Sequence, residues 1–179
     1  SEKDYIRRLI AVPGDTVEVK GAEITVGRLP FSKGDIISKL IDKDILAPAV
    51  DDFHDNLVKY SKDSVLVRGW RQEGRQWKRI EKTLTKNDLA KVIDAKSSEI
   101  TITPGVTIKN GKALDEPYTA EDPSYDMKPV KIKPGDVWVM GDNRNNSNDC
   151  HVWGPLERKR ILGKAMFIFW PVGRVRLVH

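Results

Sequence analysis

The chain has 179 residues, of which 39% are hydrophobic and 32% charged, and its formal net charge is +5. This length allows one domain with a sizeable core, or a core with a smaller satellite. No stretch approaches the roughly 20 apolar residues that a membrane-spanning helix requires, and no basic, apolar N-terminal segment indicates a targeting signal.

The sequence is poor in cysteine and histidine, the ligands of thiolate and histidine-rich metal sites. Cys150 is the only cysteine and the three histidines are scattered, so we expect no internal disulfide, no metal and no cofactor. The small positive charge fits a protein that works beside anionic lipid. It fits equally a solvated surface with slightly more lysine than glutamate, which is the commoner case.

The first elements are predicted to be strands. Residues 5–12 mix β-branched and apolar side chains and end at a Pro-Gly-Asp sequence, 13–15, which is typical of a turn. Residues 16–20 alternate apolar and charged side chains, as a half-buried strand does.

The middle of the chain has helical patterns. Residues 35–46 carry apolar side chains at helical spacing behind a Gly-Asp start. Residues 50–60 and 87–96 are shorter helix candidates with similar spacing.

Strands are also expected in this middle part, at residues 64–70 and 77–80. We therefore interpret residues 22–104 as an inserted α+β subdomain. Its end segments, 23–26 and 99–102, are expected to pair as strands that close its neck.

The C-terminal half returns to short strands and turns. Residues 106–114 predict a hairpin around Asn110 and Gly111, a pair typical of a type I′ turn. Residues 130–140 predict a strand, a Pro-Gly-Asp turn and a second strand, and residues 161–170 predict a long apolar strand.

Together these patterns indicate a mainly β fold of antiparallel sheets or a partly closed barrel, with an inserted α+β subdomain. The β domain would be discontinuous, comprising residues 1–21 and 105–179.

The segment Met140-Gly-Asp-Asn-Arg-Asn-Asn-Ser-Asn-Asp149 lies between two predicted apolar strands. Its small and amide-bearing residues suit a tight, self-bonded loop. Such a loop on rigid strands is a common place for a functional site. Taken alone, the segment could equally be an asparagine-rich turn with no function.

As a whole, the segment resembles the Gly-Asp-Asn-Arg-x-x-Ser-x-Asp box of the bacterial type I signal peptidases, proteases with a serine nucleophile and a lysine base that remove signal peptides from secreted proteins. Tyr5-Ile-Arg-Arg8 and Val12-Pro-Gly-Asp15 resemble that family's Tyr-x-Lys-Arg and Leu-Pro-Gly-Asp sequences, in the same order. Leu114-Asp-Glu-Pro-Tyr118 and Trp153-Gly154 lie where such proteins have similar sequences. The resemblance covers residues 4–21 and about 106–178.

The resemblance implies roles for the matched residues. In the family, a serine attacks the scissile carbonyl and a buried neutral lysine accepts its proton. Ser147 would orient that base, and Asp142 would pair with Arg8. The substrate would bind as an added strand along Asp4, Tyr5 and Ile6. Further residues would support the site: Arg8, Gly141, Asp142, Asn143, Arg144 and Asp149.

The chain departs from the family pattern in three ways. The nucleophilic serine belongs to a Ser-x-Met-x-Pro sequence upstream of the lysine box, and the chain begins after it, with Ser1 no substitute. Arg7 occupies the position of the lysine base, and a guanidinium does not accept a proton. His151 replaces an arginine that bridges to Asp149, so this bridge is expected to depend on protonation of the imidazole.

Cys150 beside His151 also raises a thiol-protease hypothesis. Adjacent residues of an extended segment face opposite sides, so we expect instead a small buried thiol.

The parent protein is expected to be a membrane-anchored serine endopeptidase acting on exported preproteins, on the extracytoplasmic side of the cell membrane, with its anchor and serine outside this chain. As given, the chain is predicted not to cleave peptide bonds. The alternative is an inactive relative that binds extended peptides or assists assembly at the membrane.

A third hypothesis makes the insertion a partner-binding or nucleic-acid-binding module. Residues 68–82 interleave basic residues with Trp70 and Trp77, as a surface that binds nucleic acid or a membrane can. A solvated hairpin with packed tryptophans is the commoner explanation, since Glu73 and Glu81 dilute the charge. Nucleic acid is not expected as a partner.

Overall fold

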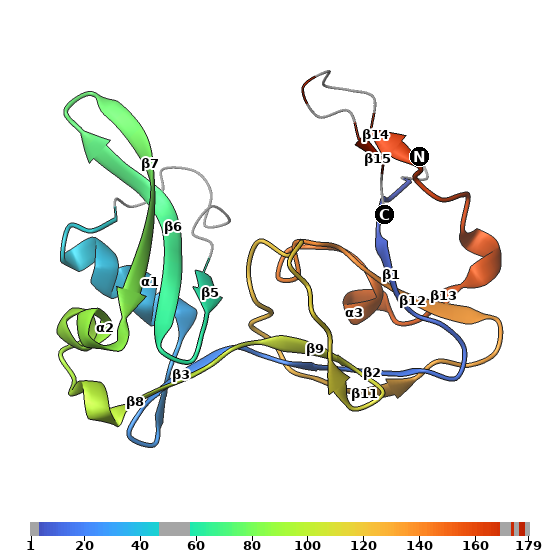
Figure 1. Ribbon diagram of the computed structural model, residues 1–179, viewed down its shortest axis with the longest axis horizontal. Coiled ribbons are helices and arrows are strands. Elements are labelled where there is room, and N and C mark those ends of the chain that lie inside the picture. Colours follow the sequence, from blue (N-terminus) through green and yellow to red (C-terminus); the bar gives the residue numbers. More distant parts are fainter. Residues whose placement is uncertain (1–3, 47–57, 169–172, 174–175, 178–179) are drawn as a thin grey trace.

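A computed structural model of the chain describes residues 4–46, 58–168, 173 and 176–177. The molecule has two lobes joined by a narrow neck (Figure 1). Buried apolar side chains form two clusters, one in each lobe. As the sequence predicts, the fold is mainly β with antiparallel pairing, and none of the sheets among the described residues closes into a barrel.

The first lobe contains two small sheets. One has the order β1-β12-β13 and the other the order β10-β9-β2-β11. Their strands are β1 (Arg8–Ala11), β2 (Thr16–Lys20), β9 (Val106–Lys109), β10 (Lys112–Ala113), β11 (Met127–Lys131), β12 (Asp136–Met140) and β13 (Leu156–Glu157).

Turn residues, and the alternation of apolar and polar side chains, determine the local structure of this lobe. Gly14 adopts a positive φ of 94° in the turn between β1 and β2. Asn110 and Gly111 have φ of 52° and 77° between β9 and β10, which confirms the predicted type I′ turn. In β2, Val17 and Val19 are buried while the residues between them are partly exposed, so the predicted alternation is present.

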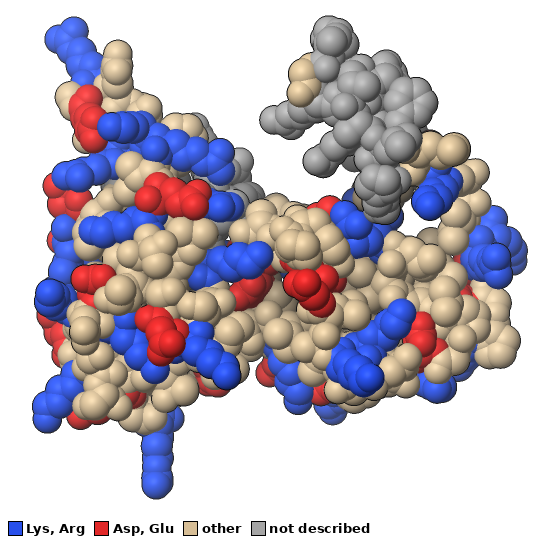
Figure 2. Space-filling view, in the orientation of Figure 1, with Lys and Arg blue, Asp and Glu red and all other residues tan. Residues whose placement is uncertain are grey.

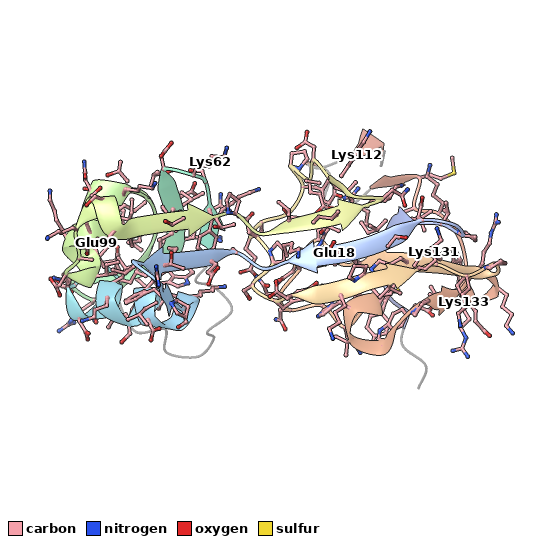
Figure 3. The ribbon with its side chains drawn as sticks, turned by 90° about the horizontal axis from the view of Figure 1, so that it is seen from below. Glu18, Lys62, Glu99, Lys112, Lys131 and Lys133 are labelled. Atoms are coloured by element: carbon pink, nitrogen blue, oxygen red, sulfur yellow. The ribbon has the colours of Figure 1, made fainter. Side chains whose placement is uncertain are left out.

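The second lobe lies within the predicted insertion and has two three-stranded sheets, with the orders β4-β3-β8 and β5-β6-β7. Their strands are β3 (Glu23–Val26), β4 (Leu29–Phe31), β5 (Val58–Tyr60), β6 (Ser64–Glu73), β7 (Gln76–Thr85) and β8 (Ile100–Thr103). The predicted pairing at the neck is confirmed, because Glu23 lies opposite Thr103 and Ile24 opposite Ile102. Figure 3 shows the continuous runs β2–β3 and β8–β9 passing through this neck.

Two capped helices cover part of the second lobe, α1 (Lys33–Asp42) and α2 (Lys86–Ile93). Each begins at a hydroxyl residue, Ser32 or Thr85, whose side chain accepts a hydrogen bond from a backbone N–H three residues on, in a capping box. The remaining elements are the short helix α3 (Cys150–Trp153), the 3-10 turns Ser97–Glu99 and Arg158–Arg160, and the strand pair β14 (Phe167–Ile168) and β15 (Arg176–Leu177).

A search of the described helices finds none with the length and apolar character needed to cross a bilayer.

Residues 119–123 of the first lobe bind the second lobe. Lys33 forms an ion pair of 2.6 Å with Glu121, whose side chain is only 4% exposed. The backbone N–H of Tyr60 donates a hydrogen bond of 2.9 Å to the carboxyl of Asp122. The lobes are thus connected by side chains as well as by the neck.

Three predicted elements differ from the structure. The first strand begins only at Arg8, and residues 4–7 are irregular. Of the helix expected at 50–60, residues 50–57 lie outside the described part of the chain, and Val58–Tyr60 is strand β5, because it pairs with β6. The long strand expected at 161–170 is wrong over 161–166, which is irregular and exposed, and only Phe167–Ile168 pairs as a strand; residues 169–170 are not described.

Candidate functional site

Antiparallel pairing of β1 with β12 brings the two sequence boxes together. Arg8 lies opposite Met140 and Leu9 opposite Val139. The irregular segment before β1 therefore faces the loop that follows β12. Residues 134 positions apart in the sequence meet at this end of the sheet.

Arg8 and Asp142 form a two-bond ion pair. Nε donates to one carboxylate oxygen and Nη2 to the other, each at 2.9 Å. This hydrogen bonding raises the pKa of Arg8 above its already high value. Because the two side chains are 32% and 46% exposed, the pair contributes more to the geometry of the junction than to stability.

Tyr118 and Glu116 support this pair from beneath. The guanidinium of Arg8 lies 3.6 Å from the centre of the Tyr118 ring, and the Tyr118 hydroxyl donates to Glu116 at 2.7 Å. Glu116 in turn accepts two hydrogen bonds, of 2.5 and 2.6 Å, from Arg144. The side chain of Arg144 is fully buried and also donates to the carbonyl of Gly141 and to the hydroxyl of Thr107.

The electrostatics of this group follow from burial and pairing. Burial alone would raise the pKa of Glu116, but hydrogen bonds from Arg144 and Tyr118 outweigh it, and the pKa lies below its usual value. Burial, with Glu116 adjacent, raises the pKa of Tyr118 to about 12. Glu116 is therefore charged at neutral pH, and Tyr118 is a neutral donor.

Gly141 lets the loop close against itself. A Cβ placed on Gly141 would lie 2.0 Å from Oγ of Ser147, so the serine side chain occupies the space that any other residue would need. The N–H of Gly141 donates to the buried carboxylate of Asp149 at 2.7 Å. Within the described part of the chain, the Ser147 hydroxyl has no hydrogen-bond partner, so it remains available to another group.

Asp149 caps helix α3 and binds His151. Its carboxylate accepts from the His151 backbone N–H at 3.0 Å and lies 2.7 Å from Nδ1 of the ring. The ring also stacks on Tyr125, with 4.6 Å between the ring centres. A charged imidazolium and a neutral imidazole with its proton on Nδ1 can both donate to this carboxylate, so the expected dependence on protonation stays a prediction.

Cys150 is buried in the core of the first lobe. Burial raises the pKa of its thiol to about 11, far above the range of a nucleophilic cysteine. His151 is bound to Asp149. The expected small buried thiol is confirmed, and the geometry offers no support for the thiol-protease hypothesis.

Arg7, which the resemblance predicts to be at the family's lysine position, is fixed as a hydrogen-bond donor. Its Nη1 donates to the carbonyl of Ile6 at 2.7 Å, and its Nη2 donates to the carbonyl of Asn148 at 3.0 Å. Its Nε is buried without a partner among the described residues. The guanidinium thus lies against the loop one residue away from Ser147, but it offers only donors.

The expected substrate strand is not formed by the described residues. Tyr5 and Ile6 are 54% and 85% exposed, and Asp4 is exposed beside them. Asn143, in the loop, accepts a hydrogen bond from the backbone of Asn146 and stabilises the turn there.

Sequence reasoning assigned no role to Glu116 and Tyr118, although both lie in the Leu114–Tyr118 sequence that it noted. Their sequence signal is a carboxylate two residues from a tyrosine, which does not reveal a partner. Within the part of the chain that the structure describes, no three potential metal ligands cluster. The site is thus at the end of a β-sheet, where charged side chains join the two sequence boxes beside the hydroxyl of Ser147.

Comparison with known proteins agrees with this geometry. Residues 1–170 match the family described as signal peptidase, peptidase S26, and the chain belongs to this family. It is 43% identical over 90 residues to a probable signal peptidase I-2 from Synechocystis sp., which covers 50% of this chain and 41% of that protein.

Two further relatives show the same similarity. A signal peptidase I from Leptolyngbya laminosa is 39% identical over 87 residues, covering 49% of this chain and 43% of that protein. The probable thylakoidal processing peptidase 2 of Arabidopsis thaliana is 33% identical over 92 residues, covering 51% and 25%. The chain spans about two fifths of the length of the bacterial relatives that it matches.

Proposed function

We propose that this chain is the part of a type I signal peptidase whose residues surround the active site. Such an enzyme is a serine endopeptidase that removes signal peptides from exported preproteins. The observation that carries the proposal is the junction of the two boxes, where the Arg8–Asp142 pair and the Arg7–Asn148 hydrogen bond join the segment before β1 to the loop that contains Ser147. The similarity to relatives that are named signal peptidase I supports the same reaction.

In this proposal the nucleophilic serine and a membrane anchor are supplied by sequence upstream of Ser1, on the extracytoplasmic side of the membrane. Ser147 has a free hydroxyl in the place from which the family orients its base. Asp4, Tyr5 and Ile6 are exposed and unpaired with any strand, so their backbone is available for an extended peptide.

One observation favours the second candidate, a protein that binds peptides without cleaving them. Arg7 stands where the proton acceptor is required, and two carbonyls hold its guanidinium in place. A fixed guanidinium donates hydrogen bonds to peptide carbonyls, but it does not take a proton from a serine hydroxyl.

The test uses the full-length protein and a radiolabelled preprotein, with the natural sequence, the Arg7→Lys variant and Arg28→Lys as a matched control. Arg28 is an exposed arginine of the second lobe, so its exchange should change nothing. Cleavage only after Arg7→Lys supports the inactive form. Cleavage by the natural protein would show that it is active, and a residue other than Arg7 would then be the general base. The peptidase proposal itself is overturned if the upstream sequence contains no Ser-x-Met-x-Pro sequence and no form cleaves.

A further inference from the structure

The positive charge of the chain is concentrated in one hairpin. Residues 64–85, which form β6 and β7, contain six lysines and arginines and two glutamates, a net charge of +4 out of +5 for the whole chain. The cations are Arg68, Arg71, Arg75, Lys78, Arg79 and Lys82. The remaining 157 residues are close to neutral overall, so the hairpin is a local feature and not part of a generally basic surface.

The outer half of this hairpin, residues 71–79, which we call the arm, projects beyond the core. Val65, Val67 and Leu84 at its base are buried, whereas every residue of the arm is exposed. Figure 1 shows the arm extending from the second lobe with no element packed on its tip. A two-stranded hairpin is at best marginally stable in water, so the extension gives little to the stability of the lobe.

Most of the cations of the hairpin form no ion pair in the described part of the chain. Arg68 pairs with Glu81 at 2.7 Å and Lys78 with Glu73 at 3.6 Å. Among the residues that the structure describes, four cations of the hairpin form no ion pair: Arg71, Arg75, Arg79 and Lys82. Three of these four lie in the arm, and Figure 2 shows blue side chains along this part of the second lobe. The charge is therefore available to an external anion.

Tryptophan and arginine share one face of the hairpin. Trp70 lies opposite Arg79, and Gln72 lies opposite Trp77. Trp77 is therefore the diagonal neighbour of Trp70 on the same face. The side chain of Trp77 remains 45% exposed, so the expectation of a fully packed tryptophan is wrong for this residue. An exposed indole between arginines has the chemistry of the lipid headgroup layer, where tryptophan and cationic side chains are both favoured.

We propose that the arm is a membrane-contact site that binds the headgroups of anionic phospholipids. The start of the described chain, which leads into β1, lies toward the same side of the molecule as the arm (Figure 1), and Tyr5 and Ile6 there are exposed. The arm of the second lobe and the first described residues of the first lobe thus point toward the same side in this view.

A lipid surface fits these observations better than nucleic acid does. A nucleic acid is bound by a track of cations that follows many successive phosphates. Outside this hairpin the net charge of the chain is only +1, which leaves little excess charge for such a track. A headgroup layer needs only the projecting tip.

The test is binding of the 179-residue chain to vesicles of phosphatidylcholine with and without phosphatidylglycerol, over a range of salt concentrations. The arm variant is Arg71→Gln, Arg75→Gln and Arg79→Gln together. The matched control is Lys112→Gln, Lys128→Gln and Lys133→Gln, which removes the same charge from exposed positions of the first lobe. Lys112 and Lys133 are labelled in Figure 3. Thermal unfolding of both variants should match that of the natural chain, because all six side chains are exposed.

We expect binding that requires phosphatidylglycerol and weakens with salt, and a loss on the order of 100-fold in the arm variant, since each cation near an anionic surface contributes about fivefold. The control should lose far less. Trp77→Ala should weaken binding without changing its salt dependence. Three results would each overturn the proposal: no binding by the natural chain, equal losses in the arm variant and the control, or tighter arm-dependent binding to a DNA duplex than to the vesicles at the same salt.

Discussion

At the scale of single residues, Gly141 is required by close approach and not by a special backbone angle. A Cβ there would lie 2.0 Å from Oγ and 2.6 Å from Cβ of Ser147. We expect Gly141→Ala to destabilise the chain by about 1–3 kcal/mol, because the loop must move to admit the methyl group. Gly163→Ala is the control, since nothing lies within 4 Å of a Cβ there. Urea unfolding of the two variants measures the difference, and equal midpoints would contradict the close contact.

Replacing Glu116 should lower the free energy of unfolding strongly. Arg144 is fully buried, and Glu116 balances its charge. We expect Glu116→Gln to cost about 3–5 kcal/mol at pH 7, as removing one partner of a buried ion pair does. Glu157→Gln, which removes an exposed carboxylate paired with Lys159, should cost no more than about 0.5 kcal/mol.

The pH dependence of this pair has a definite sign. The pKa of Glu116 is lower in the folded chain than its usual value of 4.5. Its contribution to stability is therefore fully present above that usual value and is lost as the pH falls through the lower folded-state pKa. The natural chain should lose stability steeply in this acid range, and Glu116→Gln should lose less. Unfolding curves between pH 3 and pH 7 test this, and parallel curves would contradict it.

The sequence predicts some contacts of the site and not others, and the difference lies in the kind of interaction. The pairing of Arg8 with Asp142 was implied by matching sequence boxes, and the structure contains it. The support from Glu116 and Tyr118 was not foreseen, because partners of a buried polar group are chosen by three-dimensional packing and leave no periodic pattern in the sequence. The implied roles of Arg7, Ser147 and the segment 4–6 remain predictions.

At the scale of elements, the sequence predicts correctly those turns and strands that depend on neighbouring residues. Asn110 and Gly111 require positive φ, and the alternation of β2 has one buried face, so both elements were predictable. The prediction of a strand at 161–170 was wrong over 161–166, because an apolar composition does not by itself provide a partner strand. Leu162 and Met166 remain 85% and 71% exposed. The segment 58–60 failed for the opposite reason, since pairing with β6 overrides a helical spacing.

Asp122, in the segment 119–123, predicts a pH dependence of stability with the opposite sign to that of Glu116. Burial raises the pKa of Asp122, whose carboxyl accepts from Tyr60 in the other lobe. An acid with a raised folded-state pKa stabilises the fold below its unfolded value of 3.8, and this contribution is lost as the pH rises through the folded-state pKa. Asp122→Asn keeps an acceptor for Tyr60 and should gain stability, relative to the natural chain, as the pH rises from 4 to 8. A constant difference across this range, measured by urea unfolding, would contradict it.

At the scale of the whole molecule, the two apolar clusters follow the two parts that the sequence predicted. All members of one cluster lie between Ala22 and Ile102, and all members of the other lie outside that span. We propose that residues 22–104 are a subdomain inserted into a β domain made of residues 1–21 and 105–179. A separate core for each part is what allows a domain to fold alone.

The excised segment 22–104 should therefore fold without the rest of the chain. Its ends are already adjacent, because Glu23 pairs with Thr103 across the neck, so excision leaves no long loop to close. It loses the contacts of Lys33 and Tyr60 with residues 119–123, which should lower its stability without removing its core. Dispersed amide resonances and a cooperative thermal transition are the expected results. As a control, Leu40→Asp, at a position with no exposed surface, should abolish both. An excised segment as disordered as this control would show that the insertion depends on its host, and the proposed boundary would then be wrong.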